Sequence, residues 1–221
     1  MDCSVVCIAR TLGSQGEEIA RLVAEKANFR YIDEEVVLHA AELGAVDVEQ
    51  VQDAEKRRSM VQRLVDGFGS AGTYKATDSY GGGAYAFSPK QDAIDAETAE
   101  ELRQLIKDAI ANIAAQGSAV IAAHAASYAL KEDVRALRVF VTGSRAARSK
   151  RLSESGIDLR AADLKILESD LARADYLKRF YSVNEENSTH YDLTINTDRM
   201  SPEQAADLIV SLVQVRETAS A

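Results

Sequence analysis

Short apolar segments alternate along the chain with longer segments of helical periodicity. Residues 4–9 (SVVCIA) form a nearly continuous apolar run, as expected for a central strand of a parallel sheet that is covered on both faces. Four later segments are also short, apolar or rich in β-branched residues, and each predicts a strand: 29–33, 118–123, 135–142 and 190–197.

The segments between these strands have apolar residues at every third or fourth position, which predicts helices. We expect them at about 15–27, 34–43, 96–115, 144–153, 159–181 and 201–215. Gly44 marks the end of the second, while Ser201 and Pro202 provide the N-cap and first residue of the last. Alternating strands and helices imply right-handed βαβ crossovers, so the predicted fold is α/β with a mostly parallel sheet of about five strands.

A polar helix and a long glycine-rich segment interrupt this alternation. Residues 47–66 carry only a thin apolar stripe, which suits either a homodimer contact or packing on the lid side. Residues 67–90 are rich in Gly, Ser, Thr and Tyr, and a loop of that length is usually functional or disordered. We interpret it either as a flexible loop on the acceptor side or as a plain insertion. No repeat or linker divides the chain, so one domain is expected over 1–221.

The charge of the chain limits the classes of partner. Its formal net charge of -9 gives no general attraction toward nucleic acid or an anionic membrane, so an anionic ligand must meet a local cluster of basic groups. No apolar stretch approaches the roughly 20 residues of a membrane span, and the first ten residues lack the features of a signal peptide. A cytoplasmic protein is expected.

The two cysteines lie on the first predicted strand. Four residues of strand separate Cys3 and Cys7 by about 13 Å, too far for a disulfide. We interpret them as small buried apolar residues rather than metal-binding or redox-active groups, and we assign no metal ligands.

The turn after the first strand is the first candidate for a ligand site. A turn between a buried strand and a helix directs backbone N–H groups and the positive helix end at one spot, which suits phosphate. The sequence there is Gly13, Ser14, Gln15, Gly16, followed by Glu17 and Glu18. It lacks the lysine and the following Ser or Thr of the common phosphate-binding loop G-x-x-x-x-G-K-[ST]. A tight turn with two acidic residues that favour the helix dipole is therefore an alternative.

Several segments together resemble the cytidylate-kinase-like family of P-loop nucleoside monophosphate kinases. The family's opening strand, Ser-Arg, two variable residues and Gly-Ser-Gly-Gly-Arg-Glu-Ile correspond to residues 9–19, ARTLGSQGEEI. The segments FRYIDEEVV, LRVFV, ESDLARADYLKRFY and HYDLTINTDRMSPEQAADLI resemble later blocks of the family in the same order. The resemblance implies a three-layer P-loop kinase fold with a helical lid at 159–190, with ATP, Mg²⁺ and a small-molecule nucleotide as ligands.

The chain departs from the family at the candidate turn. The family usually lacks the lysine, and Arg10 is retained below the turn, where the resemblance implies a catalytic contact with phosphate. Glu17, however, stands where the family tends to have arginine. A carboxylate about 5 Å from a phosphate costs about 3 kcal/mol per unit charge at an effective dielectric constant near 20. Affinity would then be lost, unless Glu17 points away or holds Mg²⁺.

A second departure lies on the acceptor side. Related kinases carry Gly-Arg at the end of the third strand, where this chain has Ala123 and His124. A histidine carries charge only when it is protonated, so the acceptor site is weakened or repurposed, or His124 has a local structural role. The resemblance also assigns Asp33 to acceptor contact or Mg²⁺ support. His39 and His190 are expected to be structural.

The predicted lid helix keeps basic residues. In the family pattern D-x-x-R-x-x-Y, here Asp170, Arg173 and Tyr176, the resemblance implies that Arg173 closes over the transferred phosphoryl group. Lys178 and Arg179 either contact the nucleotide or form a solvated helix face.

Two functions remain open from the sequence. The chain is either an active ATP-dependent nucleoside monophosphate kinase or a catalytically degenerate member that binds a nucleotide or a partner. The cations that converge on the 13–16 turn should discriminate between them.

Overall fold

The computed structural model describes residues 3–56, 96–122 and 124–218. The 67–90 segment, the second half of the expected 47–66 helix and Ala123 lie outside these ranges. The sheet has five strands in the order β2-β3-β1-β4-β5, and every pair is parallel. The strands are β1 (Val5–Arg10), β2 (Arg30–Ile32), β3 (Ala119–Ile121), β4 (Ala136–Thr142) and β5 (Leu193–Asn196).

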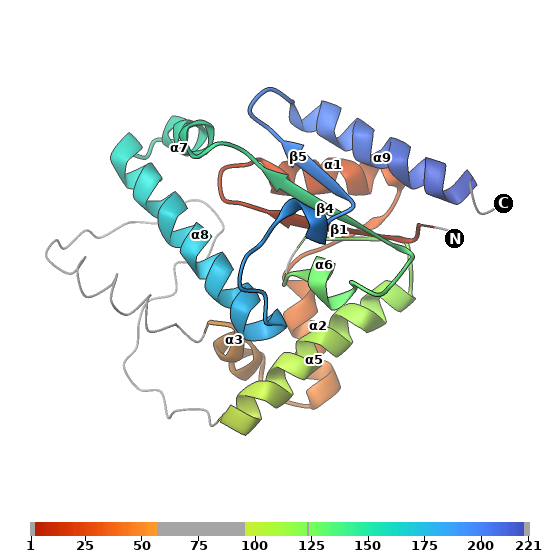
Figure 1. Cartoon of the computed structure of the whole chain (residues 1–221). Coiled ribbons are helices and arrows are strands. Elements are labelled where there is room, and N and C mark those ends of the chain that lie inside the picture. The colour runs from red at the N-terminus through yellow and green to blue at the C-terminus, as the bar shows by residue number, and fades with distance from the viewer. Residues whose placement is uncertain (1–2, 57–95, 123, 219–221) are drawn as a thin grey trace, which may run out of the picture.

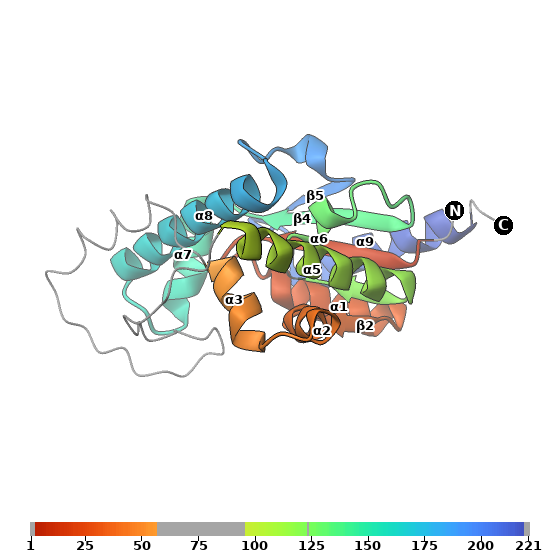
Figure 2. The same ribbon diagram turned by 90° about the horizontal axis from the view of Figure 1, so that it is seen from below.

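Helices cover both faces of the sheet (Figures 1 and 2). The described helices are α1 (Gly16–Ala27), α2 (Glu35–Gly44), α3 (Val48–Lys56), α5 (Ala96–Ala115), α6 (Ala126–Ala129), α7 (Arg145–Glu154), α8 (Leu159–Tyr181) and α9 (Pro202–Thr218). One face of the sheet packs against α1 and α9, and the other packs against α2, α5 and α6. The predicted α/β fold with a parallel sheet is confirmed.

The central strand β1 shows why its sequence is continuously apolar. Val5 and Cys7 belong to the core on the α2–α5 side, whereas Val6 and Ile8 belong to the core on the α1–α9 side. All four side chains are at most 3% exposed. A strand buried on both faces must be apolar at every position, so β1 lacks the alternation of a surface strand.

The cysteines have the expected environment. Cys3 and Cys7 are both buried and form no disulfide, which confirms their interpretation as small core residues. Burial raises the pKa of the Cys7 thiol well above its ordinary value.

Local capping signals account for the accurate helix boundaries. Ser144 accepts a hydrogen bond from the amide of Ala147 and caps α7, while Asp158 accepts from two amides and caps α8. Ser201 likewise accepts a hydrogen bond from the amide of Gln204 before α9. The four-residue helix α6 was not predicted, because so short a segment carries no periodicity.

Three strand predictions were too long by two or more residues, and one of them, 29–33, forms only the strand Arg30–Ile32. The segment 118–123 forms only the strand Ala119–Ile121. The amide of Ala122 still donates to the carbonyl of Ile32, and the chain has entered positive φ at His124. The segment 190–197 contains the strand Leu193–Asn196, preceded by a 3-10 turn over Ser188–His190 that Asn187 caps.

The first half of the polar helix packs within the chain. Val51 of α3 is fully buried in the core on the α2–α5 side, and Val48 packs against that core. The described part of the apolar stripe is therefore not available for a dimer contact. None of the described helices is long and apolar enough to span a membrane.

Candidate nucleotide site

The 13–16 turn joins the end of β1 to the start of α1. Gly13 has φ +76°, and a Cβ there would lie 2.8 Å from the carbonyl oxygen of Arg148, so glycine is required on both grounds. Ser14 is buried, and both its amide and its hydroxyl donate to the carbonyl of Thr11. These contacts hold the turn in one conformation.

The start of α1 is uncapped. Gln15 occupies the N-cap position with φ +60° and makes no side-chain capping bond. The first intrahelical bond recorded runs from the amide of Ile19 to the carbonyl of Gln15. The amides of Gly16, Glu17 and Glu18 therefore lack intrahelical acceptors, as is general for a first helical turn. They are donors for an anion beside the turn.

The two acidic residues of this helix start point outward. The Glu17 carboxylate lies 2.9 Å from the Arg21 guanidinium, one turn further along α1, and more than half of its side chain is exposed. Glu18 is also exposed. Of the alternatives for Glu17, the structure supports the one in which the side chain points away from the turn.

Two arginines of α7 hold the turn from its other side. Arg148 donates through Nη1 to the carbonyl of Leu12 at 3.3 Å, and Arg151 donates through Nη1 to the carbonyl of Gly13 at 3.2 Å. Arg151 also donates to the hydroxyl and the carbonyl of Thr197, just after β5. Neither arginine was predicted from the sequence, although both lie on the helix that follows β4 at the edge of the sheet where ligands bind.

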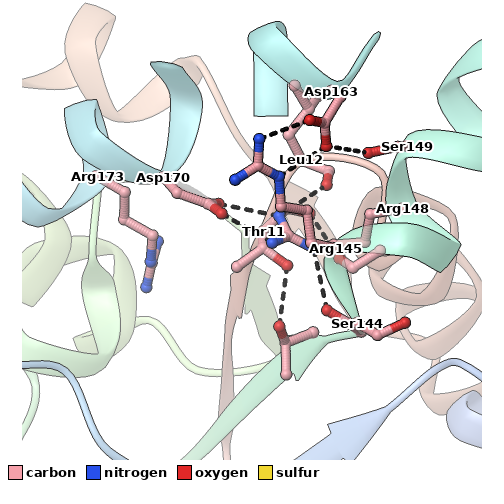
Figure 3. A network of polar contacts seen from close by, with 12 residues as sticks. Thr11, Leu12, Ser144, Arg145, Arg148, Ser149, Asp163, Asp170 and Arg173 are labelled. Carbon is pink, nitrogen blue, oxygen red and sulfur yellow. Dashed lines mark hydrogen bonds and ion pairs between the residues drawn. The ribbon is translucent and has the colours of Figure 1, made fainter. Parts of the chain in front are cut away.

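Arg148 also connects the turn to the lid helix. Its guanidinium forms a bidentate pair with Asp170 of α8 at 2.9 and 2.7 Å, and its Nε donates to the carbonyl of Gly143 (Figure 3). With the bond to Leu12, four of its five N–H groups have partners. Arg148 is therefore mainly a structural tie between β4, the turn and α8.

A pocket of about 240 Å³ opens between the ends of β1 and β4 and the helix α8. Its lining combines hydroxyls, cations and carboxylates with a small apolar wall: Thr11, Thr142, Arg148, Asp170, Arg173, Ala174, Leu177, Val183, Asn184 and Glu186. Thr11 and Thr142 join the two strand ends by a hydrogen bond of 3.2 Å (Figure 3). In the order β2-β3-β1-β4-β5, the connection from β1 runs to β2 on one side, whereas the connection from β4 runs to β5 on the other side. The crevice between β1 and β4 is therefore the topological switch point.

Arg173 is the second cation of the pocket. Its Nε and Nη2 donate to the Glu186 carboxylate at 2.8 and 2.6 Å, and Nη2 also lies 3.2 Å from the hydroxyl of Tyr191. Burial disfavours the charge on Arg173, but the hydrogen bonds with Glu186 more than offset this, so its pKa lies above the ordinary value. The same pair lowers the pKa of Glu186 despite its burial. Both groups are charged at neutral pH.

Comparison with known proteins places this geometry in a family. The family model described as "Cytidylate kinase-like family" matches residues 5–199, which include β1, the turn, the pocket and β5. The chain belongs to the cytidylate kinase-like family. The P-loop kinase fold expected from the sequence is thereby confirmed.

Solved structures share this fold at low sequence identity. An uncharacterized protein from Eubacterium ventriosum matches with a TM-score of 0.61 and 17% identity, over 96% of this chain and 98% of that chain. Shikimate kinase from Acinetobacter baumannii, in complex with shikimate, matches with a TM-score of 0.47 and 10% identity, over 97% of this chain and 94% of that chain. No curated protein sequence matches the chain.

The cytidylate kinase-like chain brings Arg10 and Asp33 together. Arg10 Nη2 lies 3.4 Å from the Asp33 carboxylate, which also accepts a hydrogen bond of 3.0 Å from Tyr31. Burial and the neighbouring carboxylate raise the pKa of Tyr31 to about 12, so its hydroxyl remains a donor. A Cβ on Gly16 would lie 2.5 Å from Arg10 Cβ, which places Arg10 directly against the turn, as the family resemblance implied.

Among the predicted site residues, all of which lie in the described part of the chain, Arg173 alone lines the pocket. Lys178 is exposed on α8, and Arg179 pairs with Asp175 at 2.7 Å. The exposure of Lys178 is compatible with a solvated helix face, while contact of Lys178 or Arg179 with a nucleotide stays a prediction. His124 follows β3, and its carbonyl accepts hydrogen bonds from Tyr176 and Tyr181 of α8. The contact of His124 with an acceptor stays a prediction.

The predicted structural histidines have local partners. His39 lies 3.6 Å from Glu42 on α2, and His190 Nδ1 lies 3.0 Å from the hydroxyl of Tyr128.

The donor set of the described residues does not form a protein-only metal site. No group of three or more His, Cys, Asp and Glu side chains in that part of the chain could hold a metal ion. Proteins often hold Mg²⁺ through one or two carboxylates together with substrate phosphates. Asp170 and Glu186 are the carboxylates of the pocket, and each already pairs with an arginine. A Mg²⁺ ion would therefore be held mainly by the phosphates of a bound nucleotide.

Proposed function

We propose that this chain binds a nucleoside triphosphate at the 13–16 turn and transfers its terminal phosphoryl group to a small acceptor. The observation that carries the proposal is that Thr11, which leads from β1 into the turn before the uncapped start of α1, lines the same pocket as Arg173. Phosphoryl transfer relies mainly on positioning and on positive groups around the transferred phosphoryl, and this arrangement supplies both.

The binding of phosphate is supported by the charges around the turn. Three amides of the first turn of α1 and the positive helix end favour an anion. Because Glu17 is paired with Arg21 on the exposed side of α1, the main objection from the sequence is removed. Arg148 and Arg151 donate to the turn's carbonyls, so these carbonyls point toward α7. In a planar trans peptide the adjoining N–H points the opposite way, which turns the Gly13 amide away from α7.

The count of donors distinguishes the two arginines of the pocket. Arg148 has four N–H groups engaged, whereas the two N–H groups of Arg173 Nη1 have no recorded partner among the described residues. Arg173 is therefore the group that would contact the transferred phosphoryl. Arg10 would support the donor phosphates from below the turn, and Asp33 would orient the acceptor beside it. ATP is the donor we propose, with Mg²⁺ reducing its charge when bound.

A second function, binding without turnover, is favoured by one observation. Each pocket arginine is paired with a carboxylate, so Arg148, Arg173, Asp170 and Glu186 together carry no net charge. Such a site would bind a nucleotide weakly and stabilise a transition state poorly. In this alternative the chain is a degenerate member of the family that binds a nucleotide or a partner. For either function we propose a cytoplasmic protein whose ligand is a small-molecule nucleotide.

Two measurements test the proposal. A calorimetric titration with ATP and Mg²⁺ measures binding, and a phosphate-transfer assay over a panel of nucleoside monophosphates measures turnover. Arg173→Met should lower transfer by about 100-fold or more, because it removes a charged donor from the transferred group. The matched control is Lys165→Met, which removes an exposed cation of the same helix and should leave transfer unchanged.

The outcomes separate the alternatives. Binding with transfer supports the kinase. Binding without transfer to any acceptor of the panel favours the degenerate nucleotide-binding protein. No heat at millimolar ATP contradicts both and leaves a role in binding a partner.

A further inference from the structure

The hydrogen bonds of the Arg173 guanidinium to described residues lie along one edge, and its face lies over the Phe140 ring, with Cζ 5.5 Å from the ring centroid. Glu186 receives Nε–H and one N–H of Nη2, and the second N–H of Nη2 is directed at the Tyr191 hydroxyl. Both charged side chains are about one-fifth exposed. This side-on pairing leaves both N–H groups of Nη1 for a ligand in the pocket that Arg173 lines.

Tyr191 completes a closed triangle with the ion pair. Its hydroxyl donates to Glu186 Oε1 and receives the bond from Arg173. A phenol has one proton, and an ionised carboxylate has none, so the direction of these bonds is fixed. The ring is stacked on Phe140 of β4, with centroids 5.0 Å apart, and is only 7% exposed. The triangle is therefore fixed to the sheet rather than to α8 alone.

We propose that Glu186 and Tyr191 are positioning residues, which hold Arg173 with Nη1 directed into the pocket and so set the rate of phosphoryl transfer. The inference rests on the proposed kinase function and adds the two residues on which its main cation depends. A free arginine side chain has considerable rotamer entropy, and fixing it before the reaction removes that cost from the chemical step. Neither residue would touch the substrate.

The same contacts would have the opposite effect if Glu186 sequestered Arg173 from phosphate. The two roles differ in sign. Loss of the Glu186 charge slows transfer if Glu186 positions the arginine, but strengthens phosphate binding if Glu186 competes with it. The experiment therefore measures kcat and KM separately.

The kinetic arm uses Glu186→Gln and Tyr191→Phe. Glu186→Gln should lower kcat about tenfold with KM for ATP changed less than about threefold, and Tyr191→Phe should lower kcat by a smaller factor. In an Arg173→Met background, Glu186→Gln should have no further effect, because Glu186 acts through that side chain. Glu185→Gln, the exposed neighbouring change, is the matched control and should leave kcat unchanged. A higher kcat, a lower KM, or an effect that persists without Arg173 overturns the inference.

A spectroscopic arm separates failure of the inference from failure of the proposed function. The Nε–H proton of Arg173 should give a protected, downfield NMR signal, assigned by its loss in Arg173→Met. It should persist in Glu185→Gln and disappear in Glu186→Gln. Inorganic tripolyphosphate with Mg²⁺ should shift it in the unaltered protein. If the protein transfers no phosphoryl group, the proposed function fails while this signal still decides the geometry. Its absence from the unaltered protein, or its persistence in Glu186→Gln, overturns the inference.

Discussion

The outward position of Glu17 predicts a small effect on nucleotide affinity. The change is Glu17→Ala, which removes one carboxylate from the start of α1. That carboxylate pairs with Arg21 at 2.9 Å, and both side chains are more than half exposed. Exposed charges interact through water, where a carboxylate about 8 Å from a phosphate costs about 0.5 kcal/mol per unit charge.

The magnitude follows from this environment. For a Mg²⁺-bound triphosphate of about two net charges, the repulsion is at most about 1 kcal/mol, and both Arg21 and salt reduce it. Glu17→Ala should therefore strengthen ATP binding by no more than about fivefold, since 1.4 kcal/mol corresponds to tenfold. It should also lower the free energy of unfolding by about 1 kcal/mol or less, through loss of the ion pair and of the favourable helix dipole contact.

The assay is calorimetric titration with ATP and Mg²⁺ at about 0.15 M salt. Glu25→Ala, which removes an exposed carboxylate near the other end of α1, is the control and should leave the affinity unchanged. A carboxylate facing the phosphates at about 5 Å and a dielectric constant near 20 would cost about 3 kcal/mol per unit charge. A gain of about 100-fold or more would therefore refute the outward position of Glu17.

Two further predictions concern stability. Gly16→Ala gains about 1 kcal/mol of helix propensity but places a Cβ 2.5 Å from Arg10 Cβ, where overpacking costs about 1–3 kcal/mol. The overpacking should prevail, so chemical denaturation should show a lower free energy of unfolding. A higher free energy of unfolding would contradict the packing of Arg10 below the turn. Asp192 is partly buried, yet its hydrogen bonds with Arg138 of β4 lower its pKa. Its contribution to the free energy of unfolding is therefore complete above about pH 4, the pKa of a free aspartate, and is lost as the pH falls through the lower pKa of the folded state. Asp192→Asn should lower the free energy of unfolding by about 1–2 kcal/mol at neutral pH, and the variant should lose less stability in acid than the unaltered protein. If the free energy of unfolding falls with pH at the same slope in both proteins, this reasoning is contradicted.

The elements of this fold were predictable because their signals are local. Strand β1 is marked by its continuous apolar run, and α7, α8 and α9 by Ser144, Asp158 and Ser201 at their N-caps. The length of β5 was overestimated because the alternation of HYDLTINT extends beyond the residues that pair with β4. The direction of Glu17 could also have been read from the sequence, since Arg21 follows at the i,i+4 spacing of a helical ion pair.

The pocket was only partly predictable because its contacts are distant in sequence. Arg173 was identified from the family pattern, but its partner Glu186 lies 13 residues later in a loop with no motif. Arg148 and Arg151 lie in a strongly charged helix, RAARSKRLSE, whose composition indicates a solvated surface. Arg148 donates a hydrogen bond to the carbonyl of Leu12, and Arg151 donates one to the carbonyl of Gly13, in each case more than 130 residues away in sequence. A tertiary contact of this kind leaves no periodic signal.

The buried thiol of Cys7 makes β1 observable by chemistry. Only a thiolate reacts readily with labelling reagents, and the high pKa and burial of Cys7 keep it protonated and inaccessible in the folded protein. Cys7 can therefore be labelled only after β1 separates from β3 and β4. Because β1 leads directly into the 13–16 turn, the labelling rate of Cys7 in the unmodified protein measures how often the strand that supports the candidate nucleotide site separates from its neighbours.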